Sequence, residues 1–382
     1  MTDRTLAVWW DDGQVGALVK DRYGDASFTY DPAWLAAPAA RPISRSLPLT
    51  VEPFDRDRCR SFFGDVSAQA DGGQGIAGAL TLLPEGLTPP RVLTGTTTPL
   101  DEEAFADILD RLQRRPLPAG GAGVRTGLAQ ARLPVVLIDG RPALPGPGQP
   151  STHIVKPEPA RFPGAVANEA WCMALATRLG LGAAPVEARE AAGRRYLLVT
   201  RYDRAVRNDR PTRLHREDAC QALGVAPERR YASEGGPAFR QLFDLVRAYV
   251  PMPARDLLRL VDVALFNLAI GNADAPGRNF AFLLDDGVRL APFHDLLATI
   301  AWPEPDERSA MPIGQARTIE ELNDEAWTRF AADAGITLPF LRRRGTALLD
   351  AIAREATSSR GDDTLRWRTA VRAAAIRQTL AR

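Results

Sequence analysis

The chain has 382 residues, enough for about two or three domains with sizeable cores. Its 48 basic and 47 acidic residues nearly cancel, so the net charge does not favour independent binding to nucleic acid or to a membrane surface. The cysteines Cys59, Cys172 and Cys220 are far apart, which argues against a disulfide framework and a zinc site. The N-terminus lacks the apolar core of a signal peptide, and no run of about eighteen apolar residues occurs, so we expect a cytoplasmic protein without a membrane span.

The first part of the chain is predicted to be rich in strands. Leu6–Trp10 and Val15–Val19 are apolar runs separated by Asp and Gly residues, a pattern typical of a hairpin. Ile43–Leu49 alternates apolar and polar residues, as a half-buried strand does, and Ala77–Leu83 is a further apolar run. Asp101–Arg114 has apolar residues on one helical face and is predicted to be an amphipathic helix.

The middle part follows a Pro- and Gly-rich linker at residues 116–123 and mixes strand and helix patterns. Leu133–Ile138, His153–Lys156 and Arg195–Thr200 are predicted strands, and Glu169–Leu179 is a predicted helix. From about residue 214 onward the pattern becomes helical. The expected helices are Glu217–Leu223, Pro237–Tyr249, Arg255–Ile270, Ile319–Ala334, Leu338–Glu355 and Thr364–Ala381.

One lysine of the middle part has two interpretations. Lys156 ends a predicted strand, where a lysine is usually a solvated charge. In a kinase-like fold, however, a strand lysine binds the phosphates of the nucleotide. Glu169 is a candidate partner for it, and is equally well explained as a carboxylate favoured by the dipole at a helix start. The sequence alone leaves both interpretations open.

The stretch from residue 265 to residue 296 carries the strongest indication of chemistry. An apolar helix is predicted to end at Gly271, and a polar loop follows it. Two short strand-type runs, Phe280–Leu284 and Val288–Ala291, are joined by a turn that contains Gly287. Such a hairpin folds the residues at its far end back toward the loop.

Three oxygen-bearing side chains lie at the two ends of this unit. Asp274 and Asn279 share the loop with four residues between them, and Asp295 follows the hairpin. Protein kinases use the same order: one carboxylate orients the attacking hydroxyl, while an Asn and a second carboxylate hold Mg²⁺, a hard ion that prefers oxygen ligands. Asp and Asn are also common in ordinary loops, so the spacing alone is a weak signal. The apolar hairpin that ends in His294 and Asp295 favours the catalytic interpretation.

Several ordered motifs of the chain resemble the HipA family, the serine/threonine-kinase-like toxins of bacterial toxin–antitoxin pairs. The matching segments are residues 40–49, 78–85, 151–156, 168–173, 201–204, 213–221 and 233–237, together with the loop and hairpin at 265–296. The resemblance implies an α+β fold with a protein-kinase-like two-lobed core and a small N-terminal β-rich subdomain. The expected boundaries are 1–118 for this subdomain, 119–205 for a mixed N-lobe and 206–382 for an all-helical C-lobe.

The resemblance also implies roles in catalysis and metal binding. Asp274 would be the catalytic aspartate that orients the substrate hydroxyl. Asn279 and Asp295 would bind Mg²⁺, and Lys156 would contact the phosphates of ATP. These positions carry the residue types that the family pattern requires, so we expect an active enzyme.

Further residues are implied in nucleotide binding. The segment from Thr200 to Tyr202 resembles the hinge whose backbone recognises adenine, and Asp203 would lie near the ribose. Residues 127–132, which include Gly127 and Gln130, resemble the phosphate-binding loop. The sequence therefore predicts an ATP site between the mixed middle part and the helical rear part.

The chain departs from the family pattern in two loops. The family usually has Asp-Gly-His-x-Lys-Asn in the catalytic loop, whereas this chain has Pro276 in the His position and Arg278 in the Lys position. Arg keeps the charge but not the geometry, and Pro stiffens the loop and removes a backbone donor. The family's autophosphorylated serine falls near Arg125, so the adjacent Thr126 is the candidate for self-regulation.

The leading interpretation is an ATP- and Mg²⁺-dependent protein serine/threonine kinase that acts as a toxin on a translation-related protein such as an aminoacyl-tRNA synthetase. The resemblance implies a HipB-like helix-turn-helix antitoxin as a partner, with DNA contacted only through it. A catalytically weak or inactive kinase fold that serves as a binding partner or co-repressor is an alternative. A small-molecule phosphotransferase is another, although the ordered motifs of the first region argue against it.

Overall fold

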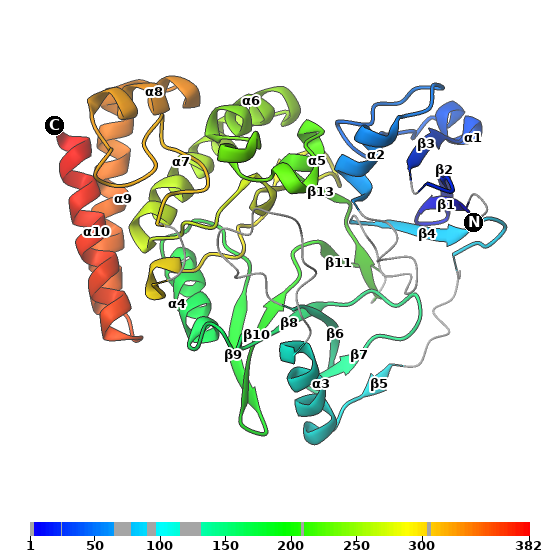
Figure 1. Cartoon of the computed structure of the whole chain (residues 1–382), viewed down its shortest axis with the longest axis horizontal. Coiled ribbons are helices and arrows are strands. Elements are labelled where there is room, and N and C mark those ends of the chain that lie inside the picture. Colours follow the sequence, from blue (N-terminus) through cyan, green and yellow to red (C-terminus); the bar gives the residue numbers. More distant parts are fainter. Residues whose placement is uncertain are drawn as a thin grey trace.

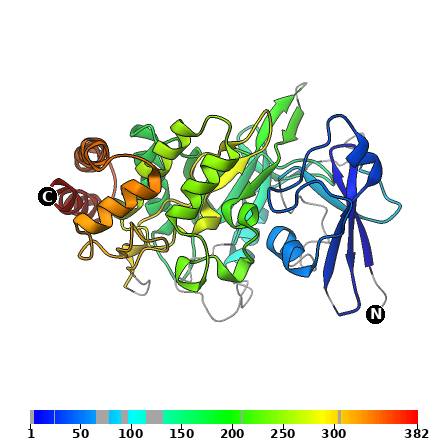
Figure 2. The same cartoon turned by 90° about the horizontal axis from the view of Figure 1, so that it is seen from above.

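The computed structural model describes residues 4–23, 25–64, 78–89, 97–114, 131–207, 210–303 and 307–382. A small sheet that holds the first strand lies at one end of the molecule, and the last three helices lie at the other end (Figure 1). A larger sheet and further helices lie between them. Viewed from above, the same order holds along the long axis, with the two termini at opposite ends (Figure 2).

The N-terminal subdomain is an antiparallel four-stranded sheet in the order β3-β2-β1-β4. Its elements are β1 (Arg4–Trp10), β2 (Gly13–Lys20), β3 (Ala26–Tyr30), β4 (Leu80–Pro84), α1 (Pro32–Ala36) and α2 (Arg56–Phe63). Phe28, Phe62 and Phe63 are buried between the sheet and α2. The strands expected at both ends of this region are therefore confirmed.

The alternating segment Ile43–Leu49 is not a strand, contrary to the prediction. It is a loop with a single bridge between Ser44 and Leu47. Tyr30 fixes this loop, because its hydroxyl donates to the Leu47 carbonyl at 2.5 Å and accepts from the Ile43 N–H at 3.0 Å. The alternation arises because Ile43 and Leu47 enter the core, while a side chain rather than a neighbouring strand satisfies the backbone.

The central sheet has six strands in the order β5-β7-β6-β8-β10-β9. Its strands are β5 (Thr98–Pro99), β6 (Leu133–Ile138), β7 (Arg141–Leu144), β8 (His153–Pro157), β9 (Val186–Ala191) and β10 (Arg194–Thr200), and its covering helices are α3 (Glu102–Arg114) and α4 (Ala165–Arg178). Along β10, Tyr196 and Leu198 join the core beneath α3, whereas Leu197 and Val199 join the core beneath α4. The two helices therefore cover opposite faces of the sheet, as strand alternation requires.

Two elements that we expected in the first region pack with the central sheet. Strand β5 pairs with β7, and α3 packs against β8, β9 and β10. The expected boundary at residue 118 therefore falls after β5 and α3, which are the first two elements in the chain that pack with the central sheet. A separate hairpin, β11 (Arg204–Arg207) with β12 (Arg210–Arg213), follows the sheet close to the second expected boundary at residue 205.

The C-terminal region is mostly helical. Its helices are α5 (Ala219–Leu223), α6 (Phe239–Tyr249), α7 (Pro253–Ile270), α8 (Asp324–Ala334), α9 (Leu338–Ser358) and α10 (Asp363–Ala381). The expectation of an all-helical region is wrong, because β13 (Arg216–Asp218), β14 (Ala281–Leu283) and β15 (Arg289–Leu290) form an antiparallel sheet there. Strands β14 and β15 are the predicted hairpin. Strand β13 has the sequence Arg-Glu-Asp, which lacks the apolar alternation that would predict a strand.

A buried polar cluster joins the N-terminal subdomain to β13. The Glu217 carboxylate accepts hydrogen bonds from Ser44 Oγ at 2.5 Å and from the Tyr249 hydroxyl at 2.6 Å. His215 Nε2 lies 2.7 Å from the Ile43 carbonyl. Burial raises the pKa of Glu217 and lowers the pKa of His215 to about 4. We call Ser44, His215, Glu217 and Tyr249 the junction cluster.

Candidate active site

Helix α7 leads into the polar loop that the sequence singled out. The last two turns of this helix are buried, and Gly271 ends it with a φ of +71°. A Cβ atom at Gly271 would lie 2.5 Å from Ile300 Cδ1, so both the backbone conformation and the packing require glycine. The loop then forms the short turn η4 (Gly277–Asn279) and enters β14, as predicted.

Asp274 is held from two sides in this loop. The hydroxyl of Tyr231 donates a hydrogen bond to Asp274 Oδ1 at 2.8 Å. The Asp274 N–H donates to Asn272 Oδ1 at 3.1 Å, and Asn279 Nδ2 donates to the Asp274 carbonyl at 3.2 Å. The structure therefore brings the predicted pair Asp274 and Asn279 into direct contact.

Asp295, the second predicted metal ligand, belongs to a group of charged side chains that form ion pairs with one another. Lys156 Nζ donates to Glu169 Oε1 at 2.5 Å and also to Asp295 Oδ1. Arg132 Nη2, which is half-exposed, donates to Asp295 Oδ2 at 2.7 Å, and His294 Nδ1 lies 3.3 Å from the same oxygen. We call Arg132, Lys156, Glu169 and Asp295 the charge cluster. Glu169 lies in the second turn of α4, so the ion pair, and not the helix dipole, explains its position.

The electrostatics of the charge cluster favour ionised partners. Burial opposes the charge on Lys156, but the carboxylates of Asp295 and Glu169 outweigh it and raise its pKa. Burial also opposes ionisation of Asp295, yet Arg132 and Lys156 hold its pKa well below the usual range. Burial raises the pKa of Glu169. Lys156 is thus kept protonated, the state in which an ammonium group can bind phosphate.

The backbone of Asp295 is unusual. Its φ is +56°, in the left-handed region that residues other than glycine seldom adopt. Such a conformation costs about 1–3 kcal/mol and persists only where surrounding contacts fix it. Asn272 supplies one contact, a long hydrogen bond of 3.5 Å from Nδ2 to the Asp295 carbonyl, and Asn267 anchors the same amide at 3.0 Å. The Asp274 loop and Asp295 are therefore joined through Asn272.

The predicted hinge lies beside the charge cluster. Thr200 is exposed at the end of β10, and the chain turns at Tyr202. The ring of Tyr202 stacks on the imidazole of His294, with centroids 5.6 Å apart and planes inclined by 15°. Because His294 directly precedes Asp295, this stacking places the hinge next to a predicted metal ligand.

Asp203 lies in a cluster of arginines. It is buried, and both of its carboxylate oxygens accept hydrogen bonds from Arg201, at 2.9 and 2.7 Å. Arg216 adds a third bond at 3.2 Å, and Arg204 lies 3.2 Å away. Burial opposes ionisation, but these arginines, Arg201 above all, hold the pKa of Asp203 below its usual range. Contact with a ribose would require one of these partners to exchange.

The predicted phosphate-binding residues Gly127 and Gln130, and the candidates Arg125 and Thr126, lie outside the described residues. The description resumes at residue 131, and Arg132, the last residue of the predicted loop, is the one that contacts Asp295. Arg132 and Tyr231 are the two contacts that sequence reasoning missed. The family's lysine near this loop could have pointed to Arg132, whereas no spacing rule connects Tyr231 with a loop 43 residues later.

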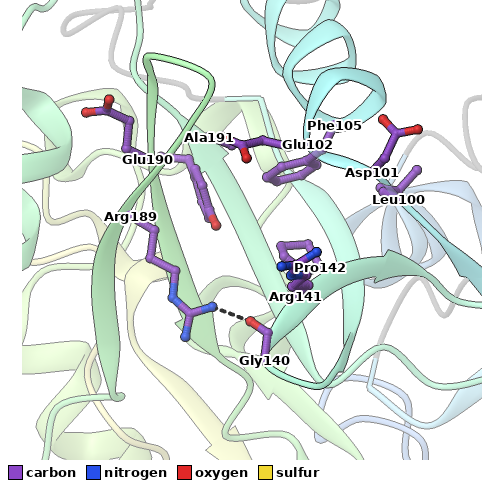
Figure 3. Close-up of a pocket in the computed structure, with 11 residues that line it drawn as sticks. Leu100, Asp101, Glu102, Phe105, Gly140, Arg141, Pro142, Arg189, Glu190 and Ala191 are labelled. Carbon is purple, nitrogen blue, oxygen red and sulfur yellow. Dashed lines mark hydrogen bonds between the residues drawn. The ribbon is translucent and has the colours of Figure 1, made fainter.

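A separate cavity of about 340 Å³ lies on the α3 side of the central sheet (Figure 3). Phe105 and Tyr196 meet edge to face in its wall, with ring centroids 5.1 Å apart. Arg189 crosses it and donates to the Gly140 carbonyl at 2.7 Å (Figure 3). Lys156 extends from the opposite face of the sheet toward α4. The cavity is therefore distinct from the site formed by Asp274 and the charge cluster.

Two family models match most of the chain. The model described as the HipA N-terminal domain matches residues 6–79, and the model described as the HipA-like C-terminal domain matches residues 119–360. The chain belongs to the HipA family. Tyr231, Asp274 and the whole charge cluster fall within the C-terminal match, so the site described above lies in that domain of the family.

Individual relatives agree with the family assignment. "Putative kinase Y4mE" of Sinorhizobium fredii is 48% identical over 92% of this chain and 91% of that protein. "Serine/threonine-protein kinase toxin HipA" of Shewanella oneidensis is 35% identical over 43% of this chain and 40% of that protein. A solved complex of HipA, HipB and operator DNA from Shewanella oneidensis contains a chain with a TM-score of 0.78 and 23% identity, covering 98% of this chain and 96% of that one. This likeness shows that the HipA family member described here has the mixed α+β fold of HipA.

Two features are absent from the part of the chain that the structure describes. No helix in the described ranges is long and apolar enough to cross a membrane. No group of three or more His, Cys, Asp and Glu side chains within them could hold a metal ion. The three cysteines are free and buried, and burial raises the pKa of each thiol.

Proposed function

We propose that this HipA-family chain is an ATP- and Mg²⁺-dependent protein serine/threonine kinase. The observation that supports this most is the setting of Asp274, whose Oδ1 accepts the Tyr231 hydroxyl at 2.8 Å. This bond orients the carboxylate and leaves Oδ2 to accept a hydrogen bond from a substrate hydroxyl. As that hydroxyl oxygen bonds to the terminal phosphorus and the bond to ADP breaks, Asp274 receives the hydroxyl proton.

The nucleotide would bind between the central sheet and the C-terminal helices, in a kinase-like two-lobed core. Its adenine would contact the backbone from Thr200 to Tyr202, beside the stacked His294 ring. Its phosphates would contact Lys156, which the carboxylates of the charge cluster keep protonated. Gly127 and Gln130 would cover the phosphates, and Asp203 would contact the ribose after one arginine exchanges.

Asn279 and Asp295 fit a Mg²⁺ ion by their donor chemistry. A carboxylate and an amide oxygen are the hard ligands that this ion prefers. The Nδ2 group of Asn279 is engaged by the Asp274 carbonyl, which leaves the amide oxygen of Asn279 for a cation. Asp295 already faces two cationic side chains, Lys156 and Arg132, which supports a site for positive charge. Bound there, Mg²⁺ would neutralise charge on the phosphates.

The proposed substrate is a protein with a serine or threonine acceptor, from the translation machinery, such as an aminoacyl-tRNA synthetase in the cytoplasm. The proposed partner is a HipB-like helix-turn-helix antitoxin, through which the chain would reach DNA. The solved complex of HipA with HipB and operator DNA motivates this proposal. The near-balance of 48 basic and 47 acidic residues fits a protein that does not bind DNA by itself.

A catalytically weak or inactive fold that acts as a binding partner or co-repressor is the second candidate. The ion pair between Arg132 and Asp295, at 2.7 Å, favours it, because this contact occupies an oxygen that a metal ion would need. Pro276 in the catalytic loop adds to this argument, since it replaces the family's His and removes a backbone donor.

Mass spectrometry after incubation with ATP and Mg²⁺ separates the two candidates. The purified chain, alone and in a cell lysate supplied with ATP carrying heavy oxygen in the γ-phosphate, is compared with Asp274→Asn. Asp286→Asn is the matched control, because it makes the same change at the exposed tip of the β14–β15 hairpin. A kinase transfers phosphate in the wild type and in the control but not in Asp274→Asn. ATP binding without transfer in either sample would favour the binding-partner function.

A further inference from the structure

A cavity of about 180 Å³ lies where the N-terminal subdomain meets the C-terminal region. The end of α2 contributes Phe62 to one wall, and the chain around α5 contributes Asp218 and Val225 to the other. Two arginines, Arg230 and Arg278, complete the lining. Among its described lining residues there is none of the charge cluster, so the cavity is separate from that cluster.

Both arginines are neighbours of groups that contact Asp274. Arg278 lies in the η4 turn and directly precedes Asn279, whose side chain donates to the Asp274 carbonyl. Arg230 directly precedes Tyr231, whose hydroxyl donates to Asp274 Oδ1, and its guanidinium lies 5.1 Å from the centre of the Tyr231 ring. The two segments that line the cavity with arginines therefore also carry the side chains that contact Asp274.

Close packing fixes the two arginine-bearing segments against each other. A Cβ atom at Gly277 would lie 2.3 Å from Pro237 Cγ. A Cβ atom at Gly236 would lie 2.1 Å from the Arg229 carbonyl oxygen. A side chain at Gly236 or Gly277 would therefore clash, so the segment that carries Arg230 packs through Pro237 against the turn that carries Arg278.

The described lining residues carry an excess of positive charge, from two arginines against one carboxylate. Within the ranges that the structure describes, neither Arg230 nor Arg278 forms an ion pair. Asp218 is the single carboxylate among the described lining residues, and it is already engaged: its Oδ1 accepts the Gln221 N–H at 3.0 Å as the N-cap of α5. Phe62 and Val225 give the lining an apolar part beside the guanidinium groups.

We infer that this cavity binds the carboxylate of an Asp or Glu residue that lies at a fixed distance from the phosphorylated serine or threonine of the substrate protein. The inference rests on the proposed kinase function and adds substrate specificity to it. Guanidinium groups bind carboxylates through two parallel hydrogen bonds, which fixes the direction of the bound group. An acidic side chain held by Arg278 and Arg230 would position the neighbouring acceptor hydroxyl over Asp274.

Peptide phosphorylation tests this inference on the full-length chain. A set of peptides with one serine acceptor carries Glu, Gln or Lys at each flanking position in turn, and kcat/KM is measured with labelled ATP. We expect the wild type to prefer Glu over Gln by about tenfold at one position. Arg230→Gln and Arg278→Gln should reduce this ratio to below about threefold, whatever their total activity. Arg229→Gln, a change at the exposed neighbour that does not line the cavity, should keep it.

A binding measurement decides the matter if no peptide is phosphorylated. Fluorescence anisotropy compares a labelled Glu-containing peptide with its Gln counterpart on the wild type and on Arg230→Gln. Tighter binding of the Glu peptide by about tenfold, lost in Arg230→Gln, supports the acidic pocket even where phosphate transfer fails. Equal binding of the Glu and Gln peptides overturns the inference. A higher kcat/KM for Lys peptides, or a kcat/KM preference for Glu that survives both arginine substitutions, overturns it as well. Loss of phosphate transfer to all proteins and peptides overturns the kinase proposal alone.

Discussion

The junction cluster and the charge cluster are both buried polar networks, but they differ in how their charges are matched. In the junction cluster, burial favours the uncharged forms: it raises the pKa of Glu217 and lowers that of His215 to about 4. In the charge cluster, Lys156 and Asp295 hold each other ionised. The first network consists of hydrogen bonds between two parts of the fold. The second consists of ion pairs, whose partners a bound nucleotide and a metal ion could replace.

This difference indicates which buried polar groups serve stability and which serve chemistry. Glu217 has its donors supplied by the protein, from Ser44 and Tyr249. Asp295 is held in a strained conformation with a φ of +56° and faces two cations that could exchange for others. Strain and mutually ionised groups of this kind are commonly found at functional sites. Substitutions in the two clusters should therefore change different measured quantities.

The largest effect is expected for Asp274→Asn. Loss of the carboxylate that we propose to orient the hydroxyl and receive its proton should lower kcat by about 1,000-fold. The melting temperature should stay within about 2 °C, because the Asn side chain can still accept the Tyr231 hydroxyl at the position of Oδ1. Steady-state kinetics with any identified substrate, together with calorimetry, measures both. A comparable loss in Asp286→Asn would mean that global damage explains the result.

The next largest effect is expected for Glu217→Ala, on stability. The substitution leaves the Ser44 and Tyr249 hydroxyls and the Arg45 N–H without their acceptor in a buried junction. The free energy of unfolding should fall by about 3 kcal/mol. Urea denaturation measures this loss. At temperatures where the variant is folded, its kcat should equal that of the wild type, since Glu217 does not contact the charge cluster. A lower kcat in the folded variant would contradict the separate roles of the two clusters.

Much of the fold could be predicted because local patterns determine it. The helices α6, α7, α9 and α10 lie within a few residues of their predicted ranges, since long runs with a 3.6-residue period leave little ambiguity. The β14–β15 hairpin follows from its turn residues. Strand β13 could not be predicted, because it exists only as a partner of β14 and its own residues are all charged.

The candidate site was predictable to a similar degree. The spacing of Asp274 and Asn279 and the hairpin before Asp295 are local features of the sequence. The contacts that complete the site are not local: Tyr231 is 43 residues from Asp274, and Arg132 is 163 residues from Asp295. These contacts arise from the packing of distant segments. Packing of the same kind explains why Ile43–Leu49 is a loop in contact with His215 of the junction cluster and not the predicted strand.

A pH effect of intermediate size is expected at His215. Its Nε2 faces the Ile43 carbonyl, which can only accept, so Nε2 carries a proton; the Ala79 N–H donates to Nδ1 at 3.4 Å, so Nδ1 carries none and the ring is neutral. Burial lowers its pKa to about 4, below the ordinary value of 6.5, so the unfolded state binds more protons between these values. Stability from this group is complete above pH 6.5 and is lost as the pH falls.

The stability of the wild type relative to His215→Gln should therefore fall by about 2 kcal/mol between pH 6.5 and pH 5. The Gln side chain can donate to Ile43 but does not titrate, so the difference removes the contribution of Glu217 and other carboxylates. Urea denaturation at four or more pH values measures it. A difference that does not change with pH would show that His215 is not held neutral.

The smallest effect gives the sharpest comparison, because it makes one change in both regions. Tyr231 donates its hydroxyl to Asp274 at 2.8 Å, and Tyr249 donates its hydroxyl to Glu217 at 2.6 Å. Tyr231→Phe frees the Asp274 carboxylate to rotate, and in the proposed kinase it should lower kcat about tenfold with little change in KM for ATP or in melting temperature. Tyr249→Phe should instead lower the free energy of unfolding by about 1–2 kcal/mol and leave kcat unchanged.

Kinetics and calorimetry on these two variants and on the double variant complete the test. The double variant should combine the two losses additively, because the hydroxyls belong to separate networks. A tenfold fall in kcat for Tyr249→Phe, or a stability loss without a kinetic effect for Tyr231→Phe, would contradict the assignment of Tyr231 as a positioning residue. If the kinetic defect persists when peptide and ATP are saturating, the effect lies on the chemical step proposed for Asp274 and not on substrate binding.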